Sequence, residues 1–202
     1  VCLATCIFGT SLLGISGYSA KVDYVESEKP ELSYLEMLGE LKNWDELDAT
    51  ERLDTLADVH YYEAERLGIN GVTLRVGYPA GESEYGAYNP ITNDITVNRT
   101  LLEQGDVLEL IDTVIHETRH VYQRLLADAY TDVEEELDEK YKRLSVFVKA
   151  RAFRDNAQSY TDAKLDGLGY YYQPLETDAR EYASQRIKST YEKVLDNTYY
   201  FE

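Results

Sequence analysis

The stretch from Asp106 to Ala127 constrains the fold of this chain most, because its pattern fits one long helix. Apolar residues recur there at spacings of three and four, the period at which an α-helix buries one face; they are Ile111, Val114, Ile115, Val121 and Leu125. Asp106, followed three residues later by Glu109, predicts a capping box at the start. We therefore expect an amphipathic helix over residues 106–127.

That helix carries the motif H-E-x-x-H, formed by His116, Glu117 and His120. Residues four apart lie one turn above each other, so both His side chains point the same way, as two imidazoles must to share one zinc ion. Glu117 lies beside them, placed as the general base that takes a proton from a zinc-bound water. Helices often carry His and Glu on solvated faces, but this chain holds only three His among 202 residues. The motif therefore predicts a catalytic Zn²⁺ site.

A catalytic zinc needs three protein ligands besides its water, and two later regions can supply the third ligand. One is the acidic segment 134–139, although a run so dense in acid is typical of a solvated face. The other is Glu176, because the small Ala179 and Ala183 share its helical face and would let two helices approach closely. We favour Glu176, with Asp178 as a partner that orients a His ring. A capping-box role for Glu176 is the alternative.

The pairing of H-E-x-x-H with a later E-x-x-A-x-x-[aromatic]-A, residues 176–183, resembles the small gluzincin metallopeptidases. It is especially similar to the bacterial group that cuts phage repressors and stress regulators. The resemblance covers the strand 94–98, the helix 106–127 and the helix 174–195, under half of the chain. It implies a zincin-like fold in which the strand before the motif lines the substrate cleft.

In that family the first helix supplies both His ligands and the base, and the second helix supplies the Glu ligand. Carried over, these are His116, His120, Glu117 and Glu176. This chain departs from the group by a long helical insertion between the two motifs and by an apparent export signal. The substrate of the family therefore does not carry over.

The first twenty residues are uncharged, largely apolar and end in small residues before Lys21. This pattern resembles the apolar region and cleavage site of a secretory signal peptide. Since the run is near membrane-spanning length, an uncleaved N-terminal anchor is the alternative. Both cysteines lie inside it, so a chain of residues 21–202 has no disulfide and no thiolate ligand. We expect 21–202 to be one metallopeptidase domain, secreted or in the cell envelope, that meets a membrane only if residues 1–20 are retained.

Charge limits the partners of this protein. Lys and Arg number 20 against 38 Asp and Glu, which gives a formal net charge of −18. A surface this acidic repels phosphate backbones, so nucleic acid is excluded as a partner. The expected partner is a peptide or protein substrate.

The rest of the chain reads as helices around a small sheet. Helical spacing covers residues 31–42, 50–67, 140–158 and 174–195, an acidic turn covers 128–139, Gly167 and Gly169 break the chain, and strands 72–76 and 94–98 belong to a sheet of two or three antiparallel strands within 72–98. The predicted fold class is α+β and mostly helical, with a small antiparallel sheet packed on the H-E-x-x-H helix and a C-terminal ligand helix.

The negative charge that develops on a peptide carbonyl needs a donor besides zinc. Tyr170, Tyr171 and Tyr172 stand just before the Glu176 helix and are candidates, although each alone suits packing as well. Arg119 and Arg180 are weaker candidates.

Two other classes of function compete with a zinc peptidase. A ferritin-like di-iron site needs a second E-x-x-H. His60 is the one remaining His and the residue three before it is Ala57, so that class fails. His60 lies on the apolar stripe of its own helix and is expected to be a core residue. The alternative that stays open is a catalytically inactive zincin-fold binding module, which metal content would distinguish.

Overall fold

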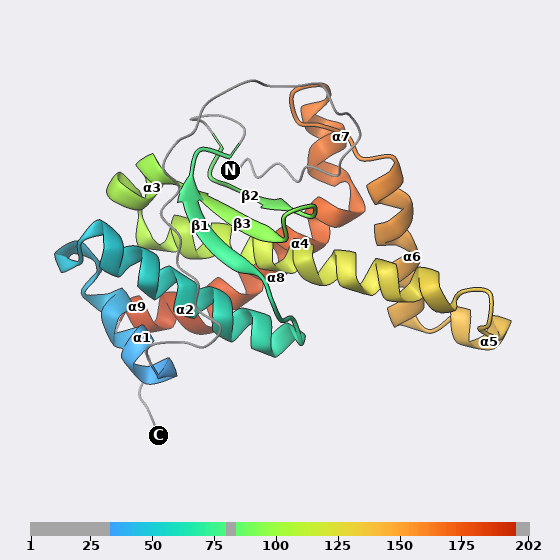
Figure 1. Cartoon of the computed structure of the whole chain (residues 1–202), viewed down its shortest axis with the longest axis horizontal. Helices are drawn as coiled ribbons and strands as arrows, with labels where there is room; N and C mark the ends of the chain where they lie inside the picture. The colour runs from blue at the N-terminus through green and yellow to red at the C-terminus, as the bar shows by residue number, and fades with distance from the viewer. Residues whose placement is uncertain (1–32, 80–83, 197–202) are drawn as a thin grey trace.

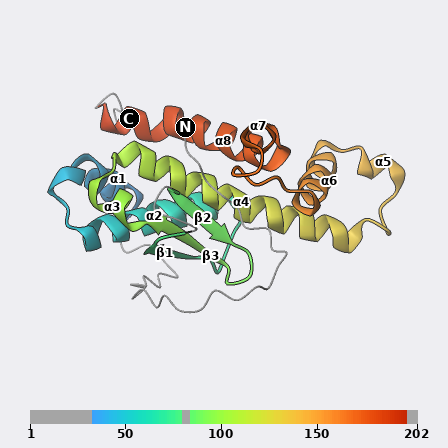
Figure 2. The ribbon, with the colours of Figure 1, turned by 90° about the horizontal axis from the view of Figure 1, so that it is seen from above.

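A helix of 27 residues, α4 (Val107–Val133), runs through the middle of the protein. In this computed structural model, which describes residues 33–79 and 84–196, the other helices and a small sheet surround it (Figure 1). Figure 2 shows α4 between helix α8 on one side and the sheet on the other. The predicted signal peptide or anchor over residues 1–20 lies outside the described residues.

The remaining helices and strands agree with a mostly helical α+β class. The helical elements are α1 (Tyr34–Lys42), the 3₁₀ turn η1 (Trp44–Glu46), α2 (Ala49–Leu67), α3 (Arg99–Gln104), α5 (Glu139–Lys142), α6 (Ser145–Gln158), α7 (Gly167–Tyr172), α8 (Pro174–Arg186), the π-helical turn η2 (Ile187–Tyr191) and α9 (Glu192–Leu195). The strands are β1 (Thr73–Gly77), β2 (Gly86–Asn89) and β3 (Asp94–Asn98).

The predicted helix at the centre is confirmed and is longer than expected. Its start is fixed by Asp106, whose side chain accepts hydrogen bonds from the backbone N–H groups of Leu108 and Glu109. The apolar stripe is buried as predicted except at Leu125, which is 46% exposed. Because α4 continues to Val133, it takes up part of the predicted acidic turn.

The sheet is mixed, so the prediction of antiparallel strands is only half right. Strand β3 lies in the centre, antiparallel to β2 and parallel to β1. A short turn at residues 90–93 joins β2 to β3 and makes that pair antiparallel. Strand β1 pairs with the opposite edge of β3 and runs in the same direction. Alternation in a sequence identifies a strand but does not give the direction of its neighbour.

Strand β2 approaches α4 so closely that only glycine fits at position 86. A Cβ atom there would lie 2.5 Å from Cγ2 of Thr113 and 3.5 Å from Cγ of Glu117. This approach brings the backbone N–H of Tyr88 to within 2.8 Å of the Glu117 carboxylate. The absence of a side chain at Gly86 therefore allows the sheet to contact Glu117 of the motif helix.

The C-terminal third differs from the prediction at three places. Residues 167–172 form helix α7 instead of a break, because the Asp166 side chain caps the N–H groups of Leu168 and Gly169. The predicted helix to Gln158 is divided into α5 and α6. The predicted helix 174–195 contains the π-helical turn η2.

A buried ionic cluster ties the C-terminal helices to α2. Glu63 of α2 is fully buried; its two oxygens share the N–H of Arg186 Nε, and Oε1 also accepts from Arg186 Nη2 and from the Tyr191 hydroxyl. Tyr182 of α8 also donates to Glu63, at 3.1 Å. Because a buried carboxylate needs such partners, the cluster fixes the end of α8 on the core.

His60 is a core residue, as predicted. It is 6% exposed, with Nδ1 at 2.8 Å from the Thr118 hydroxyl and Nε2 at 3.4 Å from the Val72 carbonyl oxygen. Burial lowers the pKa of His60 from 6.5 to about 4, so the ring is neutral in the fold at neutral pH.

Among the described helices, none combines the length and the apolar character needed to cross a membrane.

We predict that acidification lowers the unfolding free energy of the His60→Gln variant less than that of the parent. Since the pKa of His60 is about 4 in the fold against an ordinary 6.5, the neutral ring stabilises the fold fully above pH 6.5, and this stabilisation is lost toward pH 4. Over that window the parent should lose about 3 kcal/mol more unfolding free energy than the variant. Denaturant unfolding at several pH values measures this, and a difference that stays constant with pH would contradict it.

We also predict that Gly86→Ala lowers the unfolding free energy by about 1–3 kcal/mol, because α4 or β2 must shift to admit the methyl group. Gly167→Ala is the matched control, since a Cβ there would meet nothing within 4 Å. Its effect should stay below about 1 kcal/mol. Equal stabilities of the two variants in denaturant would contradict the close approach of β2 to α4.

Candidate metal centre

Two helices bring three potential metal ligands together. His116 and His120 lie one turn apart on the face of α4 that packs against α8, and Glu176 is the third residue of α8. The three side chains are at most 1% exposed. The structure shows no side-chain cap at the start of α8, and the Glu176 carboxylate turns to the two His side chains instead.

The spacing of the ligand atoms fits a tetrahedral ion. Nε2 of His116 and Nε2 of His120 are 2.9 Å apart, and they lie 3.3 and 3.4 Å from the nearest Glu176 oxygens. Two ligand atoms about 2.0–2.1 Å from a tetrahedral zinc lie roughly 3.3 Å from each other. Within the described part of the chain, this is the group of His, Cys, Asp and Glu side chains that could hold a metal ion. The residues therefore fit such an ion.

Electrostatic attraction between the Glu176 carboxylate and the two imidazoles holds these three side chains together. Burial alone would raise the pKa of Glu176, but the two imidazoles hold it well below its ordinary value. Burial alone would lower the pKa of His120, but the Glu176 carboxylate raises it to about 9. One oxygen of Glu176, Oε2, has no hydrogen-bond donor among the described residues. A dication at this position would satisfy that oxygen and replace the proton on the imidazole.

A hydrogen-bonded chain fixes the orientation of His120. Its Nδ1 lies 2.8 Å from Oε1 of Gln123, so Nε2 is the ring nitrogen that faces His116, Glu176 and the position of a metal. The amide of Gln123 donates in turn to Asp178 and to the Leu175 carbonyl oxygen. Asp178 also accepts from Arg119, at 2.7 Å. The prediction placed Asp178 directly against a His ring. In the structure Gln123 lies between Asp178 and His120, so Asp178 supports the orientation of the His120 ring only through Gln123.

The close contact of α4 and α8 depends on small residues. Ala179 and Ala183 follow Glu176 on the same helical face and are fully buried. Larger side chains there would separate the two helices and withdraw the carboxylate from the imidazoles.

The Glu117 carboxylate reaches strand β2 of the sheet. It is fully buried, and its Oε2 accepts the hydrogen bond from the Tyr88 N–H. Its Oε1 has no hydrogen-bond partner among the described residues. Burial raises the pKa of this carboxyl, which makes its ionised form a stronger base.

The tyrosines named from the sequence occupy different environments. Tyr170 is buried and packs edge-on against Tyr160, with the ring centroids 6.2 Å apart. Tyr171 and Tyr172 are 41% and 72% exposed. The phenol that reaches the ligand group is that of Tyr160, which donates to Oε1 of Glu176 at 2.7 Å.

The two arginines considered as donors are engaged elsewhere. Arg119 pairs with Asp178 and its guanidinium lies over the Tyr122 ring. Arg180 lies over the Tyr171 ring, and its Nη1 is 3.9 Å from Oε2 of Glu176. Arg180 is thus the nearer of the two to the ligand group.

The acidic segment 134–139 lies apart from the two His side chains. Glu134 follows the end of α4, fourteen residues after His120, which is roughly 21 Å along the helix axis. Its carboxylate pairs with Arg154 and accepts from the Tyr130 hydroxyl. The structure groups Glu176, and not this segment, with the two His.

Sequence reasoning missed Gln123 and Tyr160. Gln123 had a usable signal, since a polar residue three after His120 shares the face of the ligands. Tyr160 had none, because its place depends on how the segment after α6 folds back over α8.

Comparison of the chain with protein-family models, curated proteins and solved structures found no match. The geometry of the site itself therefore carries the functional argument.

We predict that Glu176→Gln weakens zinc binding strongly, because an amide is a poorer ligand for a dication than a carboxylate. Gln123→Leu should weaken it by about 10–100-fold, since His120 then loses the partner that orients its ring. Zinc titration with a competing chelator measures both affinities. Glu135→Gln, in the acidic segment, is the matched control and should bind zinc like the parent; weaker binding there than in Glu176→Gln would contradict the assignment.

Proposed function

We propose that the protein is a zinc-dependent peptidase. The observation that carries this proposal is the convergence of His116, His120 and Glu176 beside a second buried carboxylate, Glu117, that keeps one oxygen unpaired among the described residues. A purely structural zinc site takes four protein ligands, whereas three ligands leave a position open for water. A base next to that open position suits hydrolysis.

A zinc ion held by these residues would supply Lewis acidity, lowering the pKa of water toward neutrality and polarising the substrate carbonyl. The role of Glu117 is to accept the proton of the attacking water on Oε1 and to deliver it to the leaving amine. The Tyr88 N–H holds the other oxygen of Glu117 and so limits rotation of the carboxylate. The burial of Glu117 supports this role, since it favours proton uptake.

Tyr160 is our candidate for the donor that stabilises the developing negative charge on the carbonyl oxygen. Its hydroxyl donates its one proton to the ligand Glu176, so in this role it would turn that proton from the carboxylate to the carbonyl oxygen of the substrate. Tyr170 supports its ring from the side.

The edge of strand β2 is our candidate for the surface that receives the peptide. Strand β3, which the family resemblance pointed to, is paired on both sides and has no free edge. In the antiparallel register Tyr88 faces Ile95, and its N–H points outward to Glu117. An extended peptide along that edge would pass directly beside the base.

We further propose that the protein acts outside the cytoplasm, in the cell envelope or as a secreted protein. The proposal rests on the uncharged apolar stretch at residues 1–20. Peptides or proteins are the expected partners, and the net charge of −18 argues against nucleic acid.

We predict that Glu117→Gln binds zinc like the parent and loses hydrolysis by at least about a hundredfold, because no group remains to accept the proton of the water. The assay is cleavage of a broad peptide library by zinc-loaded protein, with mass spectrometry of the products. Cleavage by Glu117→Gln at the parental rate would overturn the mechanism. A zinc-loaded parent that cleaves no peptide would favour the inactive binding module.

A further inference from the structure

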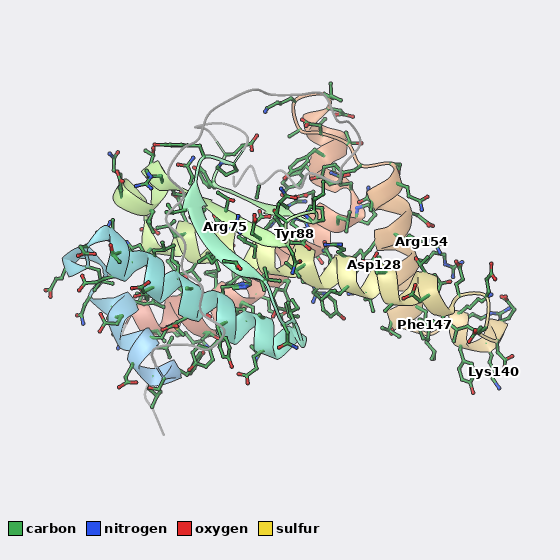
Figure 3. The ribbon with its side chains drawn as sticks, viewed as in Figure 1. Arg75, Tyr88, Asp128, Lys140, Phe147 and Arg154 are labelled. Atoms are coloured by element: carbon green, nitrogen blue, oxygen red, sulfur yellow. The ribbon has the colours of Figure 1, made fainter. Side chains whose placement is uncertain are left out.

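One end of the protein is a helical arm whose charge differs from that of the rest of the chain. The end of α4, the short helix α5 and the first half of α6 form this arm, which Figures 1 and 2 both show at the end remote from α1 and α2. In Figure 3, Lys140 and Phe147 lie there. Residues 140–151 of the arm, the basic segment, hold five Lys and Arg and no Asp or Glu. The rest of the chain holds 15 Lys and Arg against all 38 Asp and Glu, so the basic segment is an exception in an acidic protein.

The cations of the basic segment are exposed and only partly paired. The side chains of Lys140 and Lys149 are more than half exposed, and their carboxylate partners lie 3.5 and 3.3 Å away. Ion pairs this exposed contribute little to stability, so these cations can exchange partners at small cost. Arg143 and Arg151 are exposed and form no ion pair within the part of the chain that the structure describes. Lys142 is paired within α5.

Apolar side chains lie exposed among these cations. Four of them are between 42% and 50% exposed: Tyr141, Leu144, Val146 and Val148. Helix α6 packs on α4 through its other side, where Phe147 lies against Tyr130 with the ring centroids 5.8 Å apart. Cations that alternate with exposed apolar side chains are typical of helices that lie in the interface of an anionic bilayer.

Among anionic partners, a lipid surface fits both kinds of side chain in the basic segment. Anionic headgroups attract Lys and Arg, and the boundary below them accepts apolar side chains. A phosphate backbone or a purely acidic polypeptide would pair with the cations and leave the apolar side chains in water. A second copy of this chain would bring another net charge of −18, which opposes association.

The acidic remainder of the protein determines how the arm would meet such a surface. Salt screens charges that lie more than about 8 Å apart, so acidic groups remote from the arm are repelled little once the arm faces the lipid. The nearest opposing charges are Glu135 and Glu136, which are exposed and form no ion pair among the described residues. Their neighbour Glu134 is compensated by Arg154.

We propose that the basic segment is a docking surface for a bilayer that contains anionic phospholipids. Its cations contact the headgroups, and its exposed apolar side chains enter the interface. This contact needs neither zinc nor peptide hydrolysis, and it does not require residues 1–20 to be retained. His120 lies thirteen residues before the end of α4, roughly 20 Å along the helix axis, so the candidate metal centre stays clear of the docked lipid.

The test is co-sedimentation of the full chain with two kinds of vesicle, one of phosphatidylglycerol and phosphatidylcholine in equal parts and one of phosphatidylcholine alone. The parent should partition at least about tenfold more strongly to the anionic vesicles at about 0.15 M salt. About 1 M salt should remove most of this difference, because it shortens the reach of each charge to about 3 Å. Residues 1–20 are uncharged, so the phosphatidylcholine vesicles measure any contribution that they make.

A double variant tests the cations. Arg143→Gln/Arg151→Gln should bind the anionic vesicles at least about tenfold more weakly, since each cation near the surface contributes to binding. Lys42→Gln/Lys188→Gln is the matched control, because both Lys are exposed, lie outside the arm and form no ion pair among the described residues. The control should bind like the parent.

Two further variants test the rest of the surface. Glu135→Gln/Glu136→Gln should bind the anionic vesicles at least about threefold more tightly, a gain that loss of the fold cannot produce. Leu144→Ser/Val148→Ser should bind them at least about threefold more weakly, because fewer apolar groups then enter the interface.

Equal partitioning of the parent to the two kinds of vesicle would overturn the docking surface. So would parental binding by Arg143→Gln/Arg151→Gln, an equal loss in the Lys control, or no gain in Glu135→Gln/Glu136→Gln. Poly-L-glutamate serves as an acidic polymer without lipid. If it binds the parent more tightly than the anionic vesicles do, and Leu144→Ser/Val148→Ser binds those vesicles like the parent, the partner is an acidic polypeptide and the lipid proposal is wrong.

Discussion

The burial of the Glu176 carboxylate between two imidazoles is the interaction on which this structure depends. Removing a carboxylate from water costs several kcal/mol unless charge and hydrogen bonds compensate. His116, His120 and Tyr160 provide that compensation, and they come from α4 and the segment after α6. Helices α4 and α8 must therefore pack at one fixed distance and with one fixed rotation about their axes. Small residues at the contact and the buried Glu63 cluster at the far end of α8 hold them there.

The helical period of α4 places the side chains of the site on different faces of this helix. His116 and His120 project toward α8, while Glu117, one residue further round, projects toward β2. Gln123 returns to the first face and links His120 to α8. Helix α4 thus holds two of the three candidate ligands, the candidate base and the residue that orients one of these ligands. The sheet holds the base Glu117 through the Tyr88 N–H, and α8 supplies the ligand Glu176. Both elements must approach α4 closely to make these contacts.

Local patterns predicted the parts that local physics determines. The N-cap at Asp106, the buried stripe of α4 and the bounds of β3 follow from capping and periodicity. Glu176 was recognised because small residues repeat on its face. The direction of β1, the position of Tyr160 and the exposure of Leu125 depend on contacts between distant segments, which spacing within one segment does not contain.

The most direct test of this account is a crystal structure of the zinc-soaked protein with anomalous diffraction measured on both sides of the zinc absorption edge. The account predicts one strong anomalous peak, about 2.0–2.2 Å from Nε2 of His116, Nε2 of His120 and an oxygen of Glu176. A peak located elsewhere, or fully occupied zinc without Glu176 among its ligands, would contradict it.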